Sequence, residues 1–171
     1  MPDRFGSIYT RQIPARLINC LNESGVRYEI LHEPIGRSAQ GGQRSLSPGP
    51  IDTVVLRAGR QRVLAVIPAE QRFDLKKFAK LIGIAVRVET EDDFKWLFPD
   101  CTLKAIPPFG NLYGLATWVD SSLAENEYIT FLAGTPSDSI RLAYSAYIEI
   151  VEPRVGKFTT NKHGADFAPK E

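Results

Sequence analysis

The chain has 171 residues, of which 43% are apolar and 24% charged, and its formal net charge is +1. That length favours one domain with a sizeable core, and the composition excludes wholesale disorder and the broad polybasic surface that DNA binding needs. No apolar run is long enough to cross a bilayer and the N-terminus lacks the apolar core of a signal peptide, so we expect no membrane contact and a cytoplasmic location.

Few residues in the sequence suit redox or metal chemistry. Cys20 and Cys101 do not form a CxxC pair, and His32 and His163 are far apart along the chain. We therefore expect reduced thiols, no metal site and no cofactor.

Positive charge is concentrated in the first third of the chain. Residues 1–62 contain nine arginines, no lysine and five acidic residues. The planar guanidinium suits contacts with phosphate or carboxylate groups. Taken singly, most of these arginines are expected to be solvated surface residues, but the pattern is also compatible with a patch that contacts a few phosphates.

The first half of the chain predicts a helix, a strand, a loop and a hairpin. Apolar residues recur at helical spacing in 14–23, and alternation predicts a strand at 26–32. Gly, Ser, Pro and Gln dominate residues 36–50, which predicts a mobile loop. Two apolar, β-rich runs separated by Gly59-Arg60-Gln61 predict a hairpin of central strands, 52–58 and 62–68.

The second half mixes helices with strands. Helical patterns occur at 73–82, 90–98 and 144–150, and Thr90 is placed to cap the second of these. Strands are predicted at 86–89, 115–120, 128–133 and 140–142, with a turn or short helix at 121–124. Gly134-Thr135-Pro136 is expected to end the strand before it, and the apolar period is lost beyond Pro153.

One long stretch, residues 98–114, fits neither a helix nor a strand. It reads FPDCTLKAIPPFGNLYG, and Pro107 and Pro108 lack backbone donors and restrict Ile106. We predict a rigid loop, and such a loop is more often a binding loop than a mere connection. The alternative is that its Phe109, Leu112 and Tyr113 side chains only plug one end of a sheet.

The order of these elements predicts an α+β or mixed α/β fold with helices packed on a sheet. We divide the chain into an N-terminal extension, 1–12, a single domain, 13–155, and a loose C-terminal tail, 156–171. The sequence contains no GxxxxGK[ST], GxGxxG or GxSxG motif, so a P-loop, a Rossmann fingerprint and a hydrolase elbow lack support.

Several segments resemble one known family, the YbaK/ProX (YbaK/EbsC) aminoacyl-tRNA deacylases, also called prolyl-tRNA synthetase-associated editing domains. The similarity extends from about residue 14 to residue 153. It rests on GVRYEILHEP, SAQ at 38–40, VVLRAG, VLAVIPAEQRFDLKKFAKLIG, DDFKWLFPDC, PPFGNLYGL, VDSSL and FLAGTPSDSIRL.

The resemblance implies an α+β fold in which a mixed, largely antiparallel sheet wraps around a pocket for the 3′ end of aminoacyl-tRNA. Family members hydrolyse the ester of mischarged tRNA, typically alanine or cysteine on proline tRNA, and an aminoacyl-tRNA synthetase is an expected partner. In such a reaction the protein mainly positions the substrate and stabilises the charge that develops. The alternative is a catalytically degenerate module that binds aminoacyl-tRNA, a small aminoacyl ligand or a protein partner.

The family motifs carry over unevenly. The match implies pocket positions in the proline loop, Ile106, Pro108, Phe109 and Gly110, and two more at Asp120 and Gly134. Two residues depart from the pattern, because Lys104 stands where the family has glycine and Asp52 stands where it has a lysine.

An aspartate at a cation position reverses the local field. We therefore hypothesise that Lys104 reaches across the pocket to Asp52 and restores a cation for catalysis. In the alternative, Lys104 is a solvent-facing loop residue and Asp52 caps a turn.

Cys101, His32 and Asp120 each have a chemical and a structural interpretation. Cys101 could be a thiol nucleophile, but unpaired cysteines are mostly small buried apolar residues. His32 is expected to make one hydrogen bond. Asp120 would either orient a pocket group or cap the turn at Ser121-Ser122.

Overall fold

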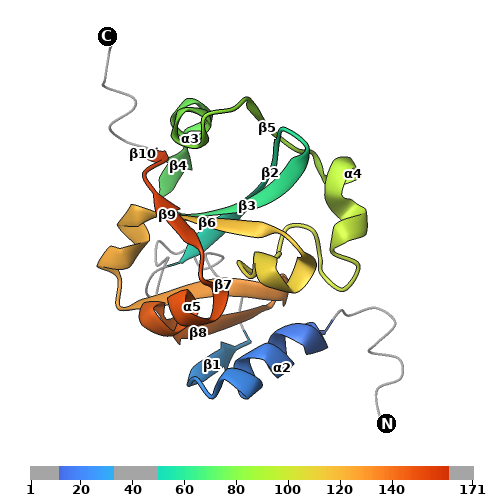
Figure 1. Cartoon of the computed structure of the whole chain (residues 1–171). Coiled ribbons are helices and arrows are strands. Elements are labelled where there is room, and N and C mark those ends of the chain that lie inside the picture. Colours follow the sequence, from blue (N-terminus) through green and yellow to red (C-terminus); the bar gives the residue numbers. More distant parts are fainter. Residues whose placement is uncertain (1–11, 33–49, 162–171) are drawn as a thin grey trace, which may run out of the picture.

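The computed structural model describes residues 12–32 and 50–161, shown in Figure 1. Its helical elements are α2 (Ala15–Ser24), α3 (Leu75–Ile82), α4 (Glu91–Phe94), α5 (Tyr144–Val151), η2 (Lys95–Leu97), η3 (Gly110–Tyr113) and η4 (Ser121–Glu125). Its strands are β1 (Tyr28–Leu31), β2 (Ile51–Ala58), β3 (Gln61–Pro68), β4 (Gln71–Phe73), β5 (Val86–Val88), β6 (Ala116–Asp120), β7 (Tyr128–Thr135), β8 (Asp138–Ala143), β9 (Arg154–Gly156) and β10 (Thr159–Asn161). Most of the predicted loop 36–50 and the SAQ segment lie outside the described residues, as do residues 1–11 of the N-terminal extension.

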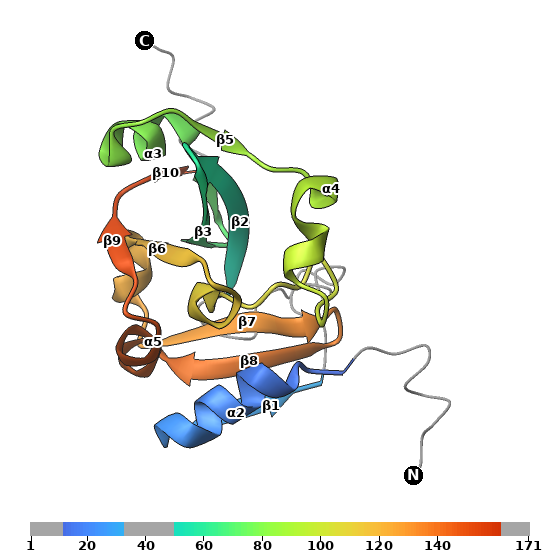
Figure 2. The ribbon, with the colours of Figure 1, turned by 45° about the vertical axis from the view of Figure 1, so that its right-hand side comes forward.

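The described strands form three sheets rather than one. The largest has the order β5-β2-β3-β6-β9, in which β5, β2 and β3 are antiparallel while β6 is parallel to both β3 and β9. An antiparallel sheet β1-β8-β7 lies below it in Figures 1 and 2, and β4 pairs with β10 at the upper edge. The predicted α+β class with a mixed, largely antiparallel arrangement is confirmed.

β3 is the middle strand of the large sheet, and its side chains enter three buried clusters. Leu64 and Val66 face the loop and the β7–β8 sheet, whereas Val63, Ala65 and Ile67 pack on the other side with Phe78 and Phe158. A strand buried on both faces reads as a continuous apolar run, which is why the sequence predicted it well. The predicted hairpin with β2 is present, with Arg57 opposite Arg62, but its loop is shorter than predicted because Gln61 belongs to β3 and pairs with Ala58.

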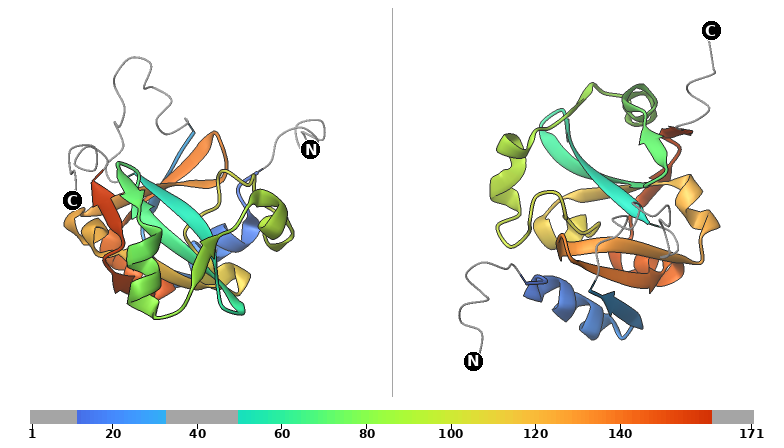
Figure 3. Two further views of the ribbon diagram at one scale, coloured as in Figure 1. Left: turned by 90° about the horizontal axis from the view of Figure 1, so that it is seen from above. Right: turned by 180° about the vertical axis from the view of Figure 1, so that it is seen from behind.

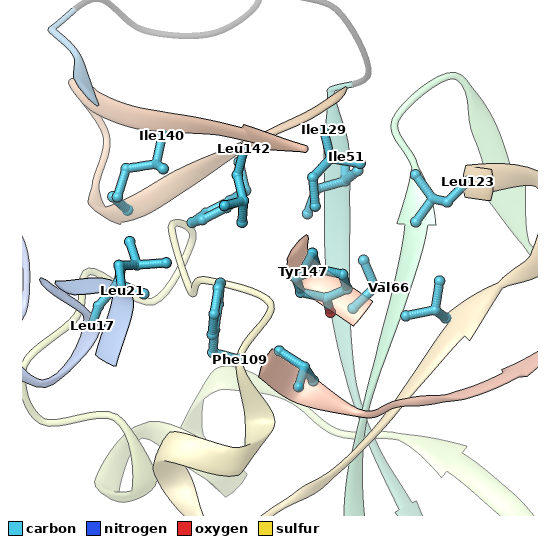
Figure 4. Close-up of a cluster of buried hydrophobic side chains, with 14 residues drawn as sticks. Leu17, Leu21, Ile51, Val66, Phe109, Leu123, Ile129, Ile140, Leu142 and Tyr147 are labelled. Carbon is cyan, nitrogen blue, oxygen red and sulfur yellow. The ribbon is translucent and has the colours of Figure 1, made fainter. Parts of the chain in front are cut away.

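The largest core lies between β7–β8, α2, α5 and the proline loop, and Figure 4 shows its side chains. Leu17 and Leu21 of α2 are fully buried there, as the helical spacing predicted. Tyr147 and Val151 of α5 are buried from the opposite end, and Phe109 is part of the same cluster. This packing is what fixes the loop relative to both sheets.

Local signals set the helix boundaries. α3 begins two residues later than predicted, because Asp74 accepts the Lys77 N–H at 3.0 Å as an N-cap while Phe73 belongs to β4. Thr90 caps α4 in a reciprocal arrangement with Asp93. None of the described helices is long and apolar enough to cross a membrane.

Two expectations about strand ends are corrected. β7 does not end before Gly134 but continues through Thr135, with a register shift in its pairing to β8. Gly134 accommodates the irregularity with φ +90°, a conformation that suits glycine. The β8 strand is likewise longer than the predicted 140–142.

The prediction of a loose tail from residue 156 is wrong for residues 156–161. Phe158 is fully buried and stacks edge-on against Phe78 with 5.0 Å between ring centroids, and the β10 strand after it pairs with β4. A short segment with a single apolar anchor has no period, so the sequence pattern could not reveal it. Residues 162–171 lie outside the described part of the chain.

Truncating this anchor tests the corrected boundary. We expect Phe158→Ala to lower the free energy of unfolding by about 3–5 kcal/mol, the usual cost of removing a buried phenylalanine ring. The matched control is Val155→Ala on β9, where the side chain is 51% exposed. The control should change stability by less than about 0.5 kcal/mol in chemical denaturation. Equal stability of Phe158→Ala and wild type would contradict a packed C-terminal segment.

Candidate functional site

The proline loop packs its side chains inward. Every residue from 105 to 110 is buried, with Phe109 at 0% exposure. Ile106 packs with Val55 and Leu64 of the large sheet, whereas Phe109 lies 5.4 Å from Phe131 and 5.5 Å from Tyr147, measured between ring centroids. Leu112 contacts both clusters, so the loop lies between two cores. Figure 4 shows Phe109 within the first of them.

Hydrogen bonds hold the loop backbone at successive carbonyl groups. The Tyr147 hydroxyl donates to the Pro108 carbonyl at 2.6 Å, and the Gly134 N–H donates to the Ala105 carbonyl at 2.8 Å. A weaker contact of 3.4 Å joins the Thr53 hydroxyl to the Ile106 carbonyl. Because three separate elements supply these donors, the predicted rigid loop is held by tertiary contacts as well as by its prolines.

Two glycines of the predicted site stand where no side chain fits. A Cβ on Gly110 would lie 2.4 Å from the Thr117 hydroxyl oxygen and 2.7 Å from the Leu115 carbonyl oxygen. A Cβ on Gly134 would lie 2.5 Å from the Pro14 ring. These positions therefore allow close backbone approach between the loop, β7 and the start of α2.

The structure places Lys104 at the exposed rim of the loop. Its side chain is 82% exposed, and its ammonium lies 3.5 Å from a Glu91 carboxylate oxygen on α4. Such an exposed pair is held weakly, by about 0–1 kcal/mol. Lys104 is therefore available to other anions near the loop.

Lys104 and Asp52 are not directed toward one another by the fold. On β2, Thr53 and Val55 face the loop, whereas Val54 and Leu56 pack on the opposite side. Strand alternation places Asp52 with the second set. The ion pair that the structure shows for Lys104 is with Glu91 on α4. Its pairing with Asp52 stays a hypothesis.

A polar network that the sequence analysis missed joins α2 to the loop. Arg16 donates to Asp100 at 2.8 Å and to the Leu112 carbonyl at 3.0 Å, and its guanidinium lies 4.4 Å from the centre of the Tyr113 ring. The Tyr113 hydroxyl in turn donates to Asp100 at 3.0 Å. No local signal could have revealed contacts between residues more than eighty positions apart.

Cys101 ends this network and behaves as a buried thiol. Its Sγ lies 3.3 Å from the Tyr113 hydroxyl oxygen. Burial, and to a smaller degree the nearby Asp100, raise the pKa of the thiol to about 11, despite a hydrogen bond with Tyr113 that lowers it. A thiol with that pKa is protonated at neutral pH, which favours the structural role over the nucleophilic one.

Asp120 is buried and its carboxylate is fully engaged. It accepts the Phe158 N–H at 2.7 Å and both the N–H and the hydroxyl of Ser122. Burial alone would raise the pKa of this carboxyl, but those hydrogen bonds and nearby Lys157 outweigh it and lower the pKa. The arrangement supports the turn-capping alternative and also ties β6 to the C-terminal segment.

His32 makes the single hydrogen bond that was expected, with its Nδ1 2.7 Å from Asp138. In the described ranges, no three His, Cys, Asp or Glu side chains converge in a way that could hold a metal ion. The loop itself contributes buried backbone groups at residues 105–110 and the exposed Lys104 ammonium.

Comparison with known proteins decides the family. The family model for the aminoacyl-tRNA editing domain matches residues 44–150, which include β2 to β8 and the whole proline loop. The chain belongs to the aminoacyl-tRNA editing domain family. It is therefore an editing domain of the YbaK/ProX type, as the sequence motifs indicated.

Individual relatives support the same assignment. The chain is 29% identical over 156 residues to the multifunctional Ser/Thr-tRNA deacylase ProXp-y of Escherichia coli K12, covering 84% of this chain and 90% of the relative. Two solved structures have the same fold at low identity. One is a putative trans-editing enzyme for prolyl tRNA synthetase, with a TM-score of 0.69, 19% identity and coverage of 84% and 94%. The other is the hypothetical protein APE2540, with a TM-score of 0.71, 16% identity and coverage of 84% and 99%.

Substituting Gly134 tests the close approach at this editing domain's loop. Gly134 and Gly83 both have positive φ, but a Cβ on Gly83 would have nothing within 4 Å. We expect Gly134→Ala to destabilise the protein by about 1–3 kcal/mol more than Gly83→Ala, because it adds overpacking to the shared backbone strain. Thermal and chemical denaturation measure the difference. Equal losses would mean that Pro14 moves aside at little cost.

Replacing Asp120 tests the buried carboxylate. The folded-state pKa is lowered, so its contribution to stability is present above the unfolded-state pKa and is lost as pH falls through the folded-state value. At pH 7 we expect Asp120→Asn to cost about 1.5–3 kcal/mol, with the difference from wild type shrinking in acid. Asp92→Asn is the control, because that side chain is 91% exposed. A pH-independent difference would contradict a charged Asp120.

Proposed function

We propose that this protein is a deacylase that hydrolyses the ester between a small amino acid and the terminal ribose of a misacylated tRNA. The observation that carries the proposal is the editing-domain match over residues 44–150, which includes the immobilised proline loop. Ester hydrolysis by positioning needs backbone groups that do not move during the reaction, and the loop meets that requirement.

In the proposed reaction, a water oxygen attacks the ester carbonyl and the bond from that carbon to the ribose oxygen breaks. The amino acid leaves as a carboxylic acid that ionises, and the ribose oxygen takes up a proton. Ile106, Pro108, Phe109 and Gly110 shape the wall of the pocket, together with Gly134. Their contribution is to hold backbone and apolar surface in a fixed place against the small side chain of the substrate.

Lys104 is the proposed cation. Its ammonium can exchange the exposed carboxylate of Glu91 for a phosphate or the developing oxyanion at low cost. Asp52 has no part in this step, because it projects from the other face of β2.

For the amino acid that is removed from the tRNA, we propose a chemical class, a small side chain. Similarity to a Ser/Thr-tRNA deacylase favours serine and threonine, whereas the family motifs favour alanine or cysteine on proline tRNA. All four are small. We propose a cytoplasmic site of action with aminoacyl-tRNA as substrate, and an aminoacyl-tRNA synthetase as the protein partner to test.

A second candidate is a binding module without turnover. The departures at Asp52 and Lys104 favour it, because the family cation is missing and its replacement sits at an exposed rim. A module of this kind would bind aminoacyl-tRNA and leave the ester intact.

The test is release of labelled amino acid from seryl-, threonyl-, alanyl- and cysteinyl-tRNA, the last two on proline tRNA. We expect wild type to deacylate at least one of these above the spontaneous rate. Lys104→Ala should lower kcat/KM about 10- to 100-fold, a loss of about 1.4–2.7 kcal/mol in transition-state stabilisation. Asp52→Ala, which removes a charge from the other face, should leave the rate unchanged.

One further variant separates the two candidates. Asp52→Lys restores the residue that the family has at this position. Turnover that appears only in Asp52→Lys would establish the wild type as a binding module. Turnover in wild type that survives Lys104→Ala unchanged would reject the proposed cation while retaining the deacylase.

A further inference from the structure

An open, positively charged groove lies at the upper edge of the molecule in Figure 1, where α3, β4 and β10 meet. It encloses about 830 Å³. Four cationic residues and one acidic residue line it, an excess of three positive charges. They are Arg72, Lys76, Lys77 and Lys157, with Asp74 as the acid.

Among the described residues, these four cations form no ion pair, although Lys157 lies near the buried Asp120. All four are exposed. By contrast, Arg62 pairs with the buried Glu89 and Arg87 lies within 3.7 Å of the same carboxylate. Cationic groups that gather without counter-charges in a concave surface focus a positive field.

Hydrogen bonds hold two of the charged residues of the groove in place. The Lys77 ammonium donates to the Thr159 carbonyl at 3.1 Å, which holds that side chain along the groove. Asp74 faces inward to the helix as its N-cap, so its charge is partly offset by the Lys77 N–H. Thr159 also lines the groove, and its buried hydroxyl oxygen has no hydrogen-bond partner.

Main-chain contacts beside β4 tie this part of the molecule to β2 and β7. The Ala69 N–H, two residues before β4, donates to the Pro50 carbonyl at 2.9 Å, and Pro50 precedes β2 and bridges to Thr130 of β7. The views in Figure 3 show β4 and β10 beside α3, with the β2–β3 hairpin next to them. These contacts and strand pairs fix the position of the groove relative to β2 and β7.

We propose that this groove binds the phosphate backbone of the acceptor arm of tRNA, an inference that rests on the proposed function. Regularly spaced phosphates are the partner that unpaired Lys and Arg side chains in an open groove recognise without reading sequence. The groove anchors the double-stranded arm while the 3′ end reaches the proline loop.

The test compares two variants of equal charge change. Arg72→Glu/Lys76→Glu alters the groove and leaves the Lys77 contact intact. Its control, Arg27→Glu/Lys95→Glu, reverses the charge of one arginine and one lysine outside the groove. Lys95 is 63% exposed. Arg27 is exposed and lies between α2 and β1, at the opposite end of the molecule (Figure 1). The probe is a fluorescent RNA hairpin that reproduces an acceptor stem with a CCA overhang.

We expect the groove variant to bind this hairpin at least tenfold more weakly than wild type at low salt, with the control close to wild type. The slope of log affinity against log salt should fall by about one for each cation lost from a phosphate contact. Circular dichroism and thermal melting of both variants establish that they are folded. Equal affinity of the two variants for the hairpin would overturn the proposal.

Activity distinguishes this proposal from the proposed function. On intact aminoacyl-tRNA, the groove variant should raise KM, while on a 3′-aminoacyl CCA trinucleotide it should match wild type. A loss on both substrates would overturn the groove as an RNA anchor. If wild type deacylates neither, the proposed deacylase fails, and the hairpin titration still decides the groove. Preferential binding of an acidic peptide over the hairpin would count against RNA as the partner.

Discussion

The immobilised backbone of residues 105–110 is the constraint on which the rest of the structure depends. Its carbonyl groups receive hydrogen bonds from α5, β7 and β2, and its side chains enter two cores at once. A loop tied to a single element could shift with that element. Here a shift would break contacts with both sheets and with α5, so the loop keeps one position.

A fixed backbone of this kind can support ester hydrolysis in an editing domain that has few acid–base side chains. Substrate positioning and backbone dipoles can supply much of the rate when they are preorganised, and reorganisation is avoided only if the framework is stiff. The departures at Lys104 and Asp52 alter the charge near this framework while leaving its backbone anchors in place. Of these two residues, Lys104 lies at the exposed rim of the loop, where its ammonium pairs with Glu91.

Charge on this molecule serves two different purposes. Arg16, Arg62 and Arg141 are each engaged with a carboxylate and an aromatic ring, which holds α2, α4 and the β1–β8 pair in place. The lysine-rich groove at β4 and β10 lacks such partners. The net charge of +1 conceals this division, because paired and unpaired cations count equally in a sum.

The sequence by itself determined the α+β class, the β2–β3 hairpin, the cap of α4 and the rigidity of the proline loop. These features depend on residues close together in the chain, and the family motifs added the editing-domain assignment. Only the tertiary structure decided the β10 strand, the engagement of Asp120 with Phe158, the contact of Lys104 with Glu91 and the network around Arg16. Each of these joins segments between 13 and 97 positions apart. Such contacts arise from packing against shared cores, which leaves no local periodicity in the sequence to detect.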